Sequence, residues 1–148
     1  MTSLIGAART SGSRGEEATL RPTTFPPIPA TVARAARAAS DKLGRDILLL
    51  EVAEVIVLTD WFVIASGSNS RQVRTIADEV SRAVKAAGGA SPRVEGMDEA
   101  RWVLLDFGDL VVHVFQPETR EFYGLERLWG DVPRIEWSDE LDEVAAGA

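Results

Sequence analysis

The stretch WFVIASGSNSRQVRTIADEVSRAVKAAGG (61–89) decides the fold, because its hydrophobic pattern changes once within it. Residues 61–66 are rich in aliphatic and β-branched side chains, which predicts a strand. After the turn-forming residues 67–70 (GSNS), apolar residues recur with the period of a helix. They are Val73, Ile76, Ala77, Val80, Val84 and Ala87. The stretch therefore predicts a strand followed by an amphipathic helix, which ends at residues 88–89 (GG).

The segment before this stretch predicts one helix and one strand. The helix would begin at Thr31, a suitable N-cap after Pro29, and end at Gly44. Its apolar face would consist of Val32, Ala35, Ala36, Ala39 and Leu43. The strand DILLLEV (46–52) is continuously apolar over 47–50, which indicates a position inside the sheet with both faces covered.

The segment after the stretch predicts three more strands. SPRVEG (91–96) is short, which favours an edge strand. RWVLLDF (101–107) and LVVHVFQ (110–116) are joined through Gly108-Asp109, a strong hairpin signal. These three strands complete a sheet whose central members are predominantly apolar.

PETREFYGLERLWG (117–130) predicts a last helix, with Pro117 near its start and Gly130 after its end. Its buried stripe would consist of Phe122, Leu125 and Trp129. Tyr123 lies about 100° round the helix from that stripe and would point outward. The predicted order α-β-β-α-β-β-β-α describes a mixed sheet with helices packed on it, an α/β sandwich.

With 148 residues, the chain has the length of one ordinary domain. Residues 1–29 are rich in Ser, Thr, Arg, Gly and Pro without an apolar period, which predicts a disordered extension. The domain would span 31–137, and 138–148 would form a flexible acidic tail. The sequence has no run of about 18 apolar residues, so no membrane span is expected.

The charge of the chain is acidic, with 23 Asp and Glu against 16 Lys and Arg and a net charge of -7. Because 1–29 holds three Arg and two Glu, the remainder carries -8. This balance disfavours a broad electrostatic contact with nucleic acid, and DNA binding is not expected. The absence of cysteine excludes disulfides and suits a reducing compartment such as the cytoplasm.

No catalytic residue, metal ligand or cofactor site is predicted. His113 is the only histidine and has no paired nucleophile, so we expect a structural histidine within or beside the core. Asp106-Phe107-Gly108 matches a kinase motif by accident and would straddle the hairpin turn. Residues 67–70 would cap a helix, and the acidic residues of 95–99 and of the hairpin turn would be solvated.

One basic stripe lies on the polar face of the central helix. It consists of Arg71, Arg74, Arg82 and Lys85. These side chains could contact RNA phosphates. Asp78 lies within helical reach of both Arg74 and Arg82, and surface ion pairs with it account for the stripe.

Three segments resemble one protein family in their order and spacing. They are TDWFVIASGSNSRQVRTIADEV (59–80), VEG (94–96) and WVLLDFGDLVVHVFQPETREFYGLERLW (102–129). The family is Iojap, also called ribosomal silencing factor RsfS, and the resemblance covers about 31–137. Gly124 departs from it, because the family commonly has an acidic residue there.

The resemblance implies a non-enzymatic repressor of translation with a nucleotidyltransferase-like α/β fold. Such a factor would bind the large ribosomal subunit through its conventional fourteenth protein and block joining of the small subunit when nutrients are scarce. The contact residues carried over from the family are Trp102, Tyr123, Leu125, Glu126, Leu128 and Trp129. The helical positions support Tyr123 as outward, whereas they place Leu125 and Trp129 in the core.

Two other functions stay open from the sequence. A nucleotidyltransferase-like enzyme would need Gly-Ser followed by paired carboxylates that hold metal ions, whereas Gly67-Ser68 is followed by the adjacent Asp78-Glu79, which point to different helix faces. A minor contact with ribosomal RNA could use the basic stripe. The edge strand 91–96 could also pair with a second copy, so both a monomer and a homodimer remain open.

Overall fold

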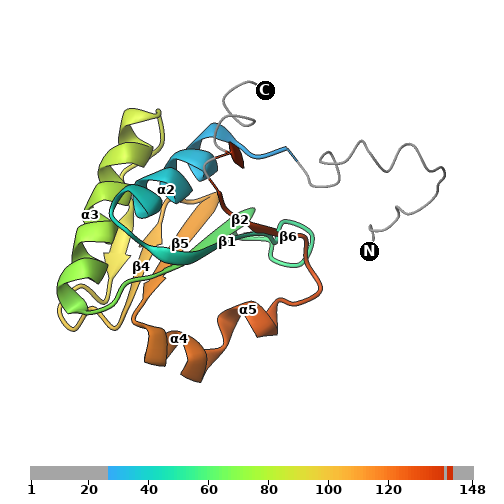
Figure 1. Ribbon diagram of the computed structural model, residues 1–148. Coiled ribbons are helices and arrows are strands. Elements are labelled where there is room, and N and C mark those ends of the chain that lie inside the picture. Colours follow the sequence, from blue (N-terminus) through green and yellow to red (C-terminus); the bar gives the residue numbers. More distant parts are fainter. Residues whose placement is uncertain (1–26, 139, 142–148) are drawn as a thin grey trace.

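The computed structural model of the chain describes residues 27–138 and 140–141 (Figure 1). Its elements in chain order are α2 (Ala30–Asp41), β1 (Arg45–Glu51), β2 (Trp61–Ser66), α3 (Ser70–Ala86), β3 (Arg93–Glu95), β4 (Trp102–Asp106), β5 (Leu110–Phe115), α4 (Pro117–Tyr123), α5 (Leu125–Leu128) and β6 (Arg134–Glu136). The predictions for 1–26, 139 and 142–148 lie outside the described residues.

The strands form a single sheet in the order β3-β4-β5-β2-β1-β6. β2 and β5 are parallel, with Phe62 opposite Val111, and the other pairs are antiparallel. The hairpin between β4 and β5 turns at Gly108, whose φ of 99° suits glycine, and Asp106 Oδ1 accepts a hydrogen bond from the Gly108 N–H at 2.9 Å. The predicted mixed-sheet α/β sandwich is confirmed, with β3 at the edge and β1 inside the sheet.

One face of the sheet is covered by the two long helices α2 and α3 (Figure 1). The side of α2 that faces α3 and the sheet is built from alanines, and Ala35, Ala36 and Ala39 are fully buried. Their small side chains let α2 approach α3 closely. α3 contributes the predicted apolar stripe, and Asn69 Oδ1 caps it by accepting from the Gln72 N–H at 2.9 Å. We call this buried set the helix-covered core.

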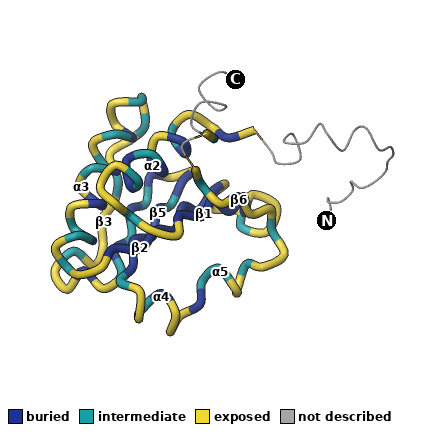
Figure 2. The backbone as a smooth tube through the Cα atoms, in the orientation of Figure 1, coloured by how far each residue is buried: buried dark blue, intermediate teal, exposed yellow. Residues whose placement is uncertain are grey.

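The opposite face carries a smaller apolar cluster under α4, α5 and the loop between β1 and β2. Its buried members are Leu48, Leu50, Val52, Phe62, Ile64 and Phe115. Leu125 and Trp129 of the α5 region and Ile56 of the loop pack against it while staying partly exposed. Figure 2 shows that many residues of the central strands are buried, whereas those of α4 and α5 are largely intermediate or exposed.

Several details of the sequence prediction were wrong. The first helix starts at Ala30 with Pro29 at the N-cap position, so Thr31 lies inside it. The predicted helix over 117–130 is two helices, because Gly124 adopts a left-handed conformation with φ 59° and ends α4. The strand β6 was not predicted, because it is only three residues long and is held by pairing with β1.

The last described residues of the chain lie close to the helix-covered core. Trp137 and Leu141 pack against it while partly exposed. Among the described residues, no helix combines the length and the apolar character needed to cross a membrane.

Candidate partner-binding surface

Three aromatic side chains meet where β4 begins and α4 ends. The ring centroids of Trp102 and Tyr123 are 4.9 Å apart, and Phe122 meets Tyr123 edge to face at the same distance. Phe122 is 79% exposed and Tyr123 is 55% exposed, so both rings face solvent. We call Trp102, Phe122 and Tyr123 the aromatic cluster. Exposed aromatic groups of this kind are typical anchors of protein interfaces.

Trp102 contacts two side chains of the neighbouring strand β5. Its indole Nε1 donates to His113 Nδ1 at 3.1 Å, and its ring stacks on Phe115 with centroids 4.9 Å apart. His113 is only 4% exposed and packs against Phe62. Burial lowers the pKa of His113 to about 4, so at neutral pH the imidazole is uncharged and its Nδ1 can accept the indole hydrogen. The prediction of a buried, hydrogen-bonded histidine is confirmed.

An open pocket of about 670 Å³ adjoins the aromatic cluster. Its lining includes all three aromatic residues and the carboxylates Asp98, Glu99 and Glu118. One cation, Arg101, also lines it and forms an exposed ion pair with Glu99 at 3.5 Å. Three carboxylates against one guanidinium leave the pocket acidic, which suits a basic partner.

A buried arginine fixes α4 and α5 to the sheet. Arg120 donates to Ser66 Oγ at 2.7 Å and from its Nε to Glu126 Oε1 at 3.2 Å. It therefore links the end of β2 to both short helices across the break at Gly124. The left-handed glycine allows the chain to turn so that Glu126 returns to Arg120. This link positions Tyr123, which ends α4.

The structure separates the six predicted contact residues. Trp102 and Tyr123 come together in the aromatic cluster, and Tyr123 points outward as predicted. Leu125 and Trp129 pack against the smaller apolar cluster but stay partly exposed, so they are less buried than the predicted core stripe. Leu128 is 70% exposed, and the Glu126 carboxylate is bonded to Arg120.

The sequence-based prediction for Phe122 was wrong, because its side chain is exposed. The prediction put it in the buried stripe of one continuous helix, and the break at Gly124 removes that geometry. The acidic lining was also missed, because Glu118 and the 98–99 pair meet only through the fold. The sequence did show 95–99 as an acidic group, and this was the one available signal.

The basic stripe on α3 is not one free surface. Arg74 Nε donates to the Met97 carbonyl at 2.9 Å, and Arg82 forms its ion pair with Glu79. The expected pairing of both arginines with Asp78 was therefore wrong, because backbone carbonyls and Glu79 lie closer to these guanidinium groups. Arg71 and Lys85 remain exposed at opposite ends of the helix.

The carboxylates that an enzyme would need are not brought together. Asp78 is exposed on α3, and Glu79 is bonded to Arg82. Within the described part of the chain, no three His, Cys, Asp or Glu side chains are grouped in a way that could hold a metal ion. Asp78 and Glu79 therefore do not form one paired carboxylate site.

Comparison with known proteins identifies the family of the chain. Residues 26–148 match the family RsfS, described as "Ribosomal silencing factor during starvation". The chain belongs to the RsfS family. Ribosomal silencing factor RsfS of Bacillus subtilis is 46% identical over 99 residues, which cover 67% of this chain and 84% of that protein. The resemblance seen in the sequence is thereby confirmed.

Two further relatives of this RsfS-family chain extend the comparison. A crystal structure from Chromobacterium violaceum has a TM-score of 0.66 and 37% identity, and covers 68% of this chain and 83% of that chain. Mouse "Mitochondrial assembly of ribosomal large subunit protein 1" is 34% identical over 106 residues, which cover 70% of this chain and 45% of that protein. Family membership makes the chain a ribosomal silencing factor, a regulator of translation.

Proposed function

We propose that this chain binds the large ribosomal subunit through its conventional fourteenth protein and sterically blocks joining of the small subunit. The aromatic cluster and the acidic pocket beside it form the contact surface. The repression would act when nutrients are limited, in keeping with the family description "during starvation".

The observation that carries the proposal is the exposure of the aromatic cluster beside carboxylates. Phe122 and Tyr123 present apolar rings to water, which is unfavourable unless a partner covers them. The adjacent Asp98, Glu99 and Glu118 supply negative charge for a basic ribosomal protein. Aromatic anchors would provide the affinity, and the charges would steer the encounter.

The rigidity of the surface supports the same function. Trp102 is fixed by His113 and Phe115, and α4 is fixed by Arg120. Side chains that are already ordered lose little conformational entropy on binding, so more of the contact energy appears as affinity. Steric blocking then needs no reaction, only occupancy of the docking site.

The choice of the large subunit is supported by a relative's name. The mouse relative is named for assembly of the ribosomal large subunit. A nucleotidyltransferase-like enzyme is less well supported, because Glu79 is engaged by Arg82 and Asp78 stands apart from it. Three other carboxylates, of Asp98, Glu99 and Glu118, lie instead beside the aromatic cluster.

Sedimentation of the protein with purified large or small subunits tests the proposal. The wild-type chain should pellet with large subunits only. The double substitution Phe122→Ala/Tyr123→Ala should weaken binding by about 2 kcal/mol or more, which is roughly 30-fold. The control Val57→Ala/Leu58→Ala removes exposed apolar side chains from the loop between β1 and β2 and should bind normally. Equal loss in both variants, or pelleting with small subunits, would contradict the proposed surface.

A further inference from the structure

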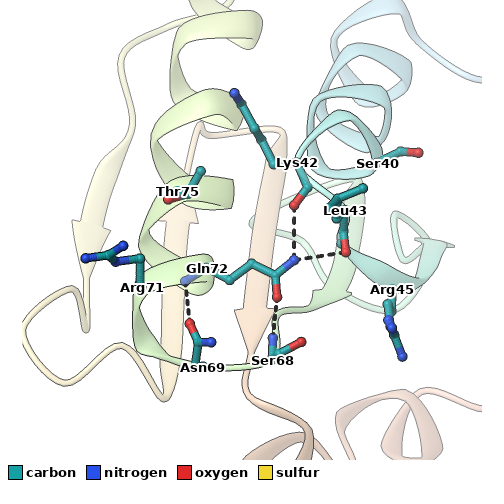
Figure 3. A pocket seen from close by; sticks show the side chains of 10 residues that line it. Ser40, Lys42, Leu43, Arg45, Ser68, Asn69, Arg71, Gln72 and Thr75 are labelled. Atoms are coloured by element: carbon teal, nitrogen blue, oxygen red, sulfur yellow. Dashed lines mark hydrogen bonds between the residues drawn. The ribbon is translucent and has the colours of Figure 1, made fainter.

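A second pocket, of about 750 Å³, lies between the turn after α2 and the start of α3 (Figure 3). Three cations line it and no carboxylate does. Lys42 follows α2, Arg45 begins β1, and Arg71 lies in the first turn of α3. Their positive charge contrasts with the net charge of -7 of the chain, and Glu79, whose pKa is lowered mainly by Arg82 and also by Lys42, lies outside the lining. The pocket is therefore a local exception to the acidic surface.

We propose that this basic pocket is a contact site for the phosphate backbone of RNA. It goes beyond the proposed protein contact and does not depend on it. The residues differ from those of the basic stripe suggested by the sequence, since Arg74 and Arg82 are engaged within the chain. Arg71 is shared, and Lys42 and Arg45 come from a turn that only the fold brings near it.

One glutamine, Gln72, links the two turns that line the pocket. Gln72 Nε2 donates to the carbonyls of Lys42 and Leu43 at 3.1 and 3.0 Å, and Gln72 Oε1 accepts from the Ser68 N–H at 2.6 Å. These bonds fasten the turn after α2 to the turn before α3, as Figure 3 shows. The backbone carrying the cations is thus fixed before any ligand arrives, which lowers the entropy cost of binding.

Two backbone N–H groups of this turn are already bonded within the chain. Gln72 N–H is bonded to Asn69, and Ser68 N–H is bonded to Gln72. The proposed anion contact is therefore assigned to the side-chain cations. Lys42, Arg45 and Arg71 are exposed, and within the described residues none of them forms an ion pair or hydrogen bond through its side chain.

The directions of the three cations favour an extended polyanion over a single phosphate. In Figure 3 the three side chains point in different directions, with Arg71 directed away from the other two, so their charged ends do not converge on one point. A chain of successive phosphates can contact several of them, whereas a free phosphate cannot. Leu43 lies in the turn between Lys42 and Arg45, is 75% exposed and has a strained left-handed conformation with φ 66°. Its side chain would add an apolar contact to the RNA.

Fluorescence anisotropy with a labelled RNA hairpin tests this site in the full-length protein. The logarithm of the affinity should fall with the logarithm of salt concentration with a slope of about -2 to -3. Reversing the cations in Lys42→Glu/Arg45→Glu/Arg71→Glu should weaken binding by about tenfold or more at low salt and flatten that slope.

A matched variant separates the site from the overall charge. Arg34→Glu/Arg93→Glu/Arg127→Glu reverses the same number of exposed cations elsewhere and should retain most of the RNA affinity. Gln72→Leu should weaken RNA binding with all three cations still present. No binding by the wild type, equal loss in both triple variants, or equally tight binding of a mononucleotide would overturn the proposal. Since the assay contains no ribosomal protein, its outcome is independent of the proposed function.

Discussion

The two faces of the sheet differ in how they are covered, and the proposed function assigns recognition to the less covered face. Among the described residues, 25 buried apolar side chains belong to the helix-covered core beneath α2 and α3, against six in the cluster on the opposite face. The first face is sealed by two long helices. The second is covered by two short helices, a loop and aromatic rings that remain open to solvent.

Under the proposed function, the chain uses one face for folding and the other for contact with its partner. Long helices with continuous apolar stripes bury the most area, and buried apolar area is the main source of stability. The broken α4–α5 segment buries less, yet a buried arginine keeps it rigid. Substitutions on the first face should therefore change stability, and those on the exposed part of the second face should change binding.

The largest expected effect is on the first face. Ile76→Ala removes a fully buried side chain from α3 and should lower the free energy of unfolding by about 4 kcal/mol. Binding to large subunits, per folded molecule, should stay unchanged. Thr75→Ala, on the exposed side of the same helix, is the control for chemical denaturation. Loss of binding without loss of stability in Ile76→Ala would erase the distinction between the faces.

Arg120→Ala should affect both properties, because this residue joins the second face to the sheet. It leaves the Glu126 carboxylate without its partner and should cost about 3 kcal/mol of stability, near the lower end for breaking a buried pair. Large-subunit binding should weaken as well, since α4 loses its position. The exposed Arg127→Ala is the control, and equal destabilisation in the two variants would contradict the role of the buried link.

The pH dependence of stability probes the support beneath Trp102. Burial lowers the pKa of His113 from 6.5 to about 4, so the unfolded chain binds more protons than the folded chain between these values. The stabilising contribution is complete above pH 6.5 and is lost as the pH falls. By pH 5 the loss in the free energy of unfolding should amount to about 2 kcal/mol. His113→Gln should remove most of this pH dependence in thermal melts between pH 7 and 5, and an unchanged slope would contradict the assignment.

The smallest expected effect concerns the break between α4 and α5. Gly124→Ala places a side chain in the left-handed region and should cost about 1 kcal/mol. The added Cβ would also press on the Arg127 side chain, which can move. Gly130→Ala is the control, because its Cβ would meet only ordinary contacts. A Gly124→Ala variant as stable as wild type would show that the turn does not require glycine.

The first face could be predicted from the sequence because its signals are local. The apolar stripe of α3, the alanine face of α2 and the hairpin at Gly108 all follow from residue spacing. A capping asparagine and a closing pair of glycines also mark the ends of α3. These patterns determine the elements without any knowledge of their neighbours.

The second face could be predicted only in part, because its contacts are not local. Tyr123 was correctly placed outward, but Phe122 was misplaced since one φ angle at Gly124 redirects the chain. The bond between Arg120 and Glu126 spans six residues, which is no helical spacing. The meeting of Trp102 with Tyr123 also depends on the direction in which α4 leaves β5, and the hairpin signal that predicts the pairing of β4 with β5 does not give that direction.

The measurement that tests the central claim most directly is subunit joining followed by light scattering. Large subunits are first incubated with the wild-type protein, with Phe122→Ala/Tyr123→Ala, or with the control Val57→Ala/Leu58→Ala, and small subunits are then added. The wild type and the control should suppress joining in a saturable manner, and the cluster variant should leave it near the level without protein. Free joining at saturating wild-type concentration, or full suppression by the cluster variant, would contradict the account.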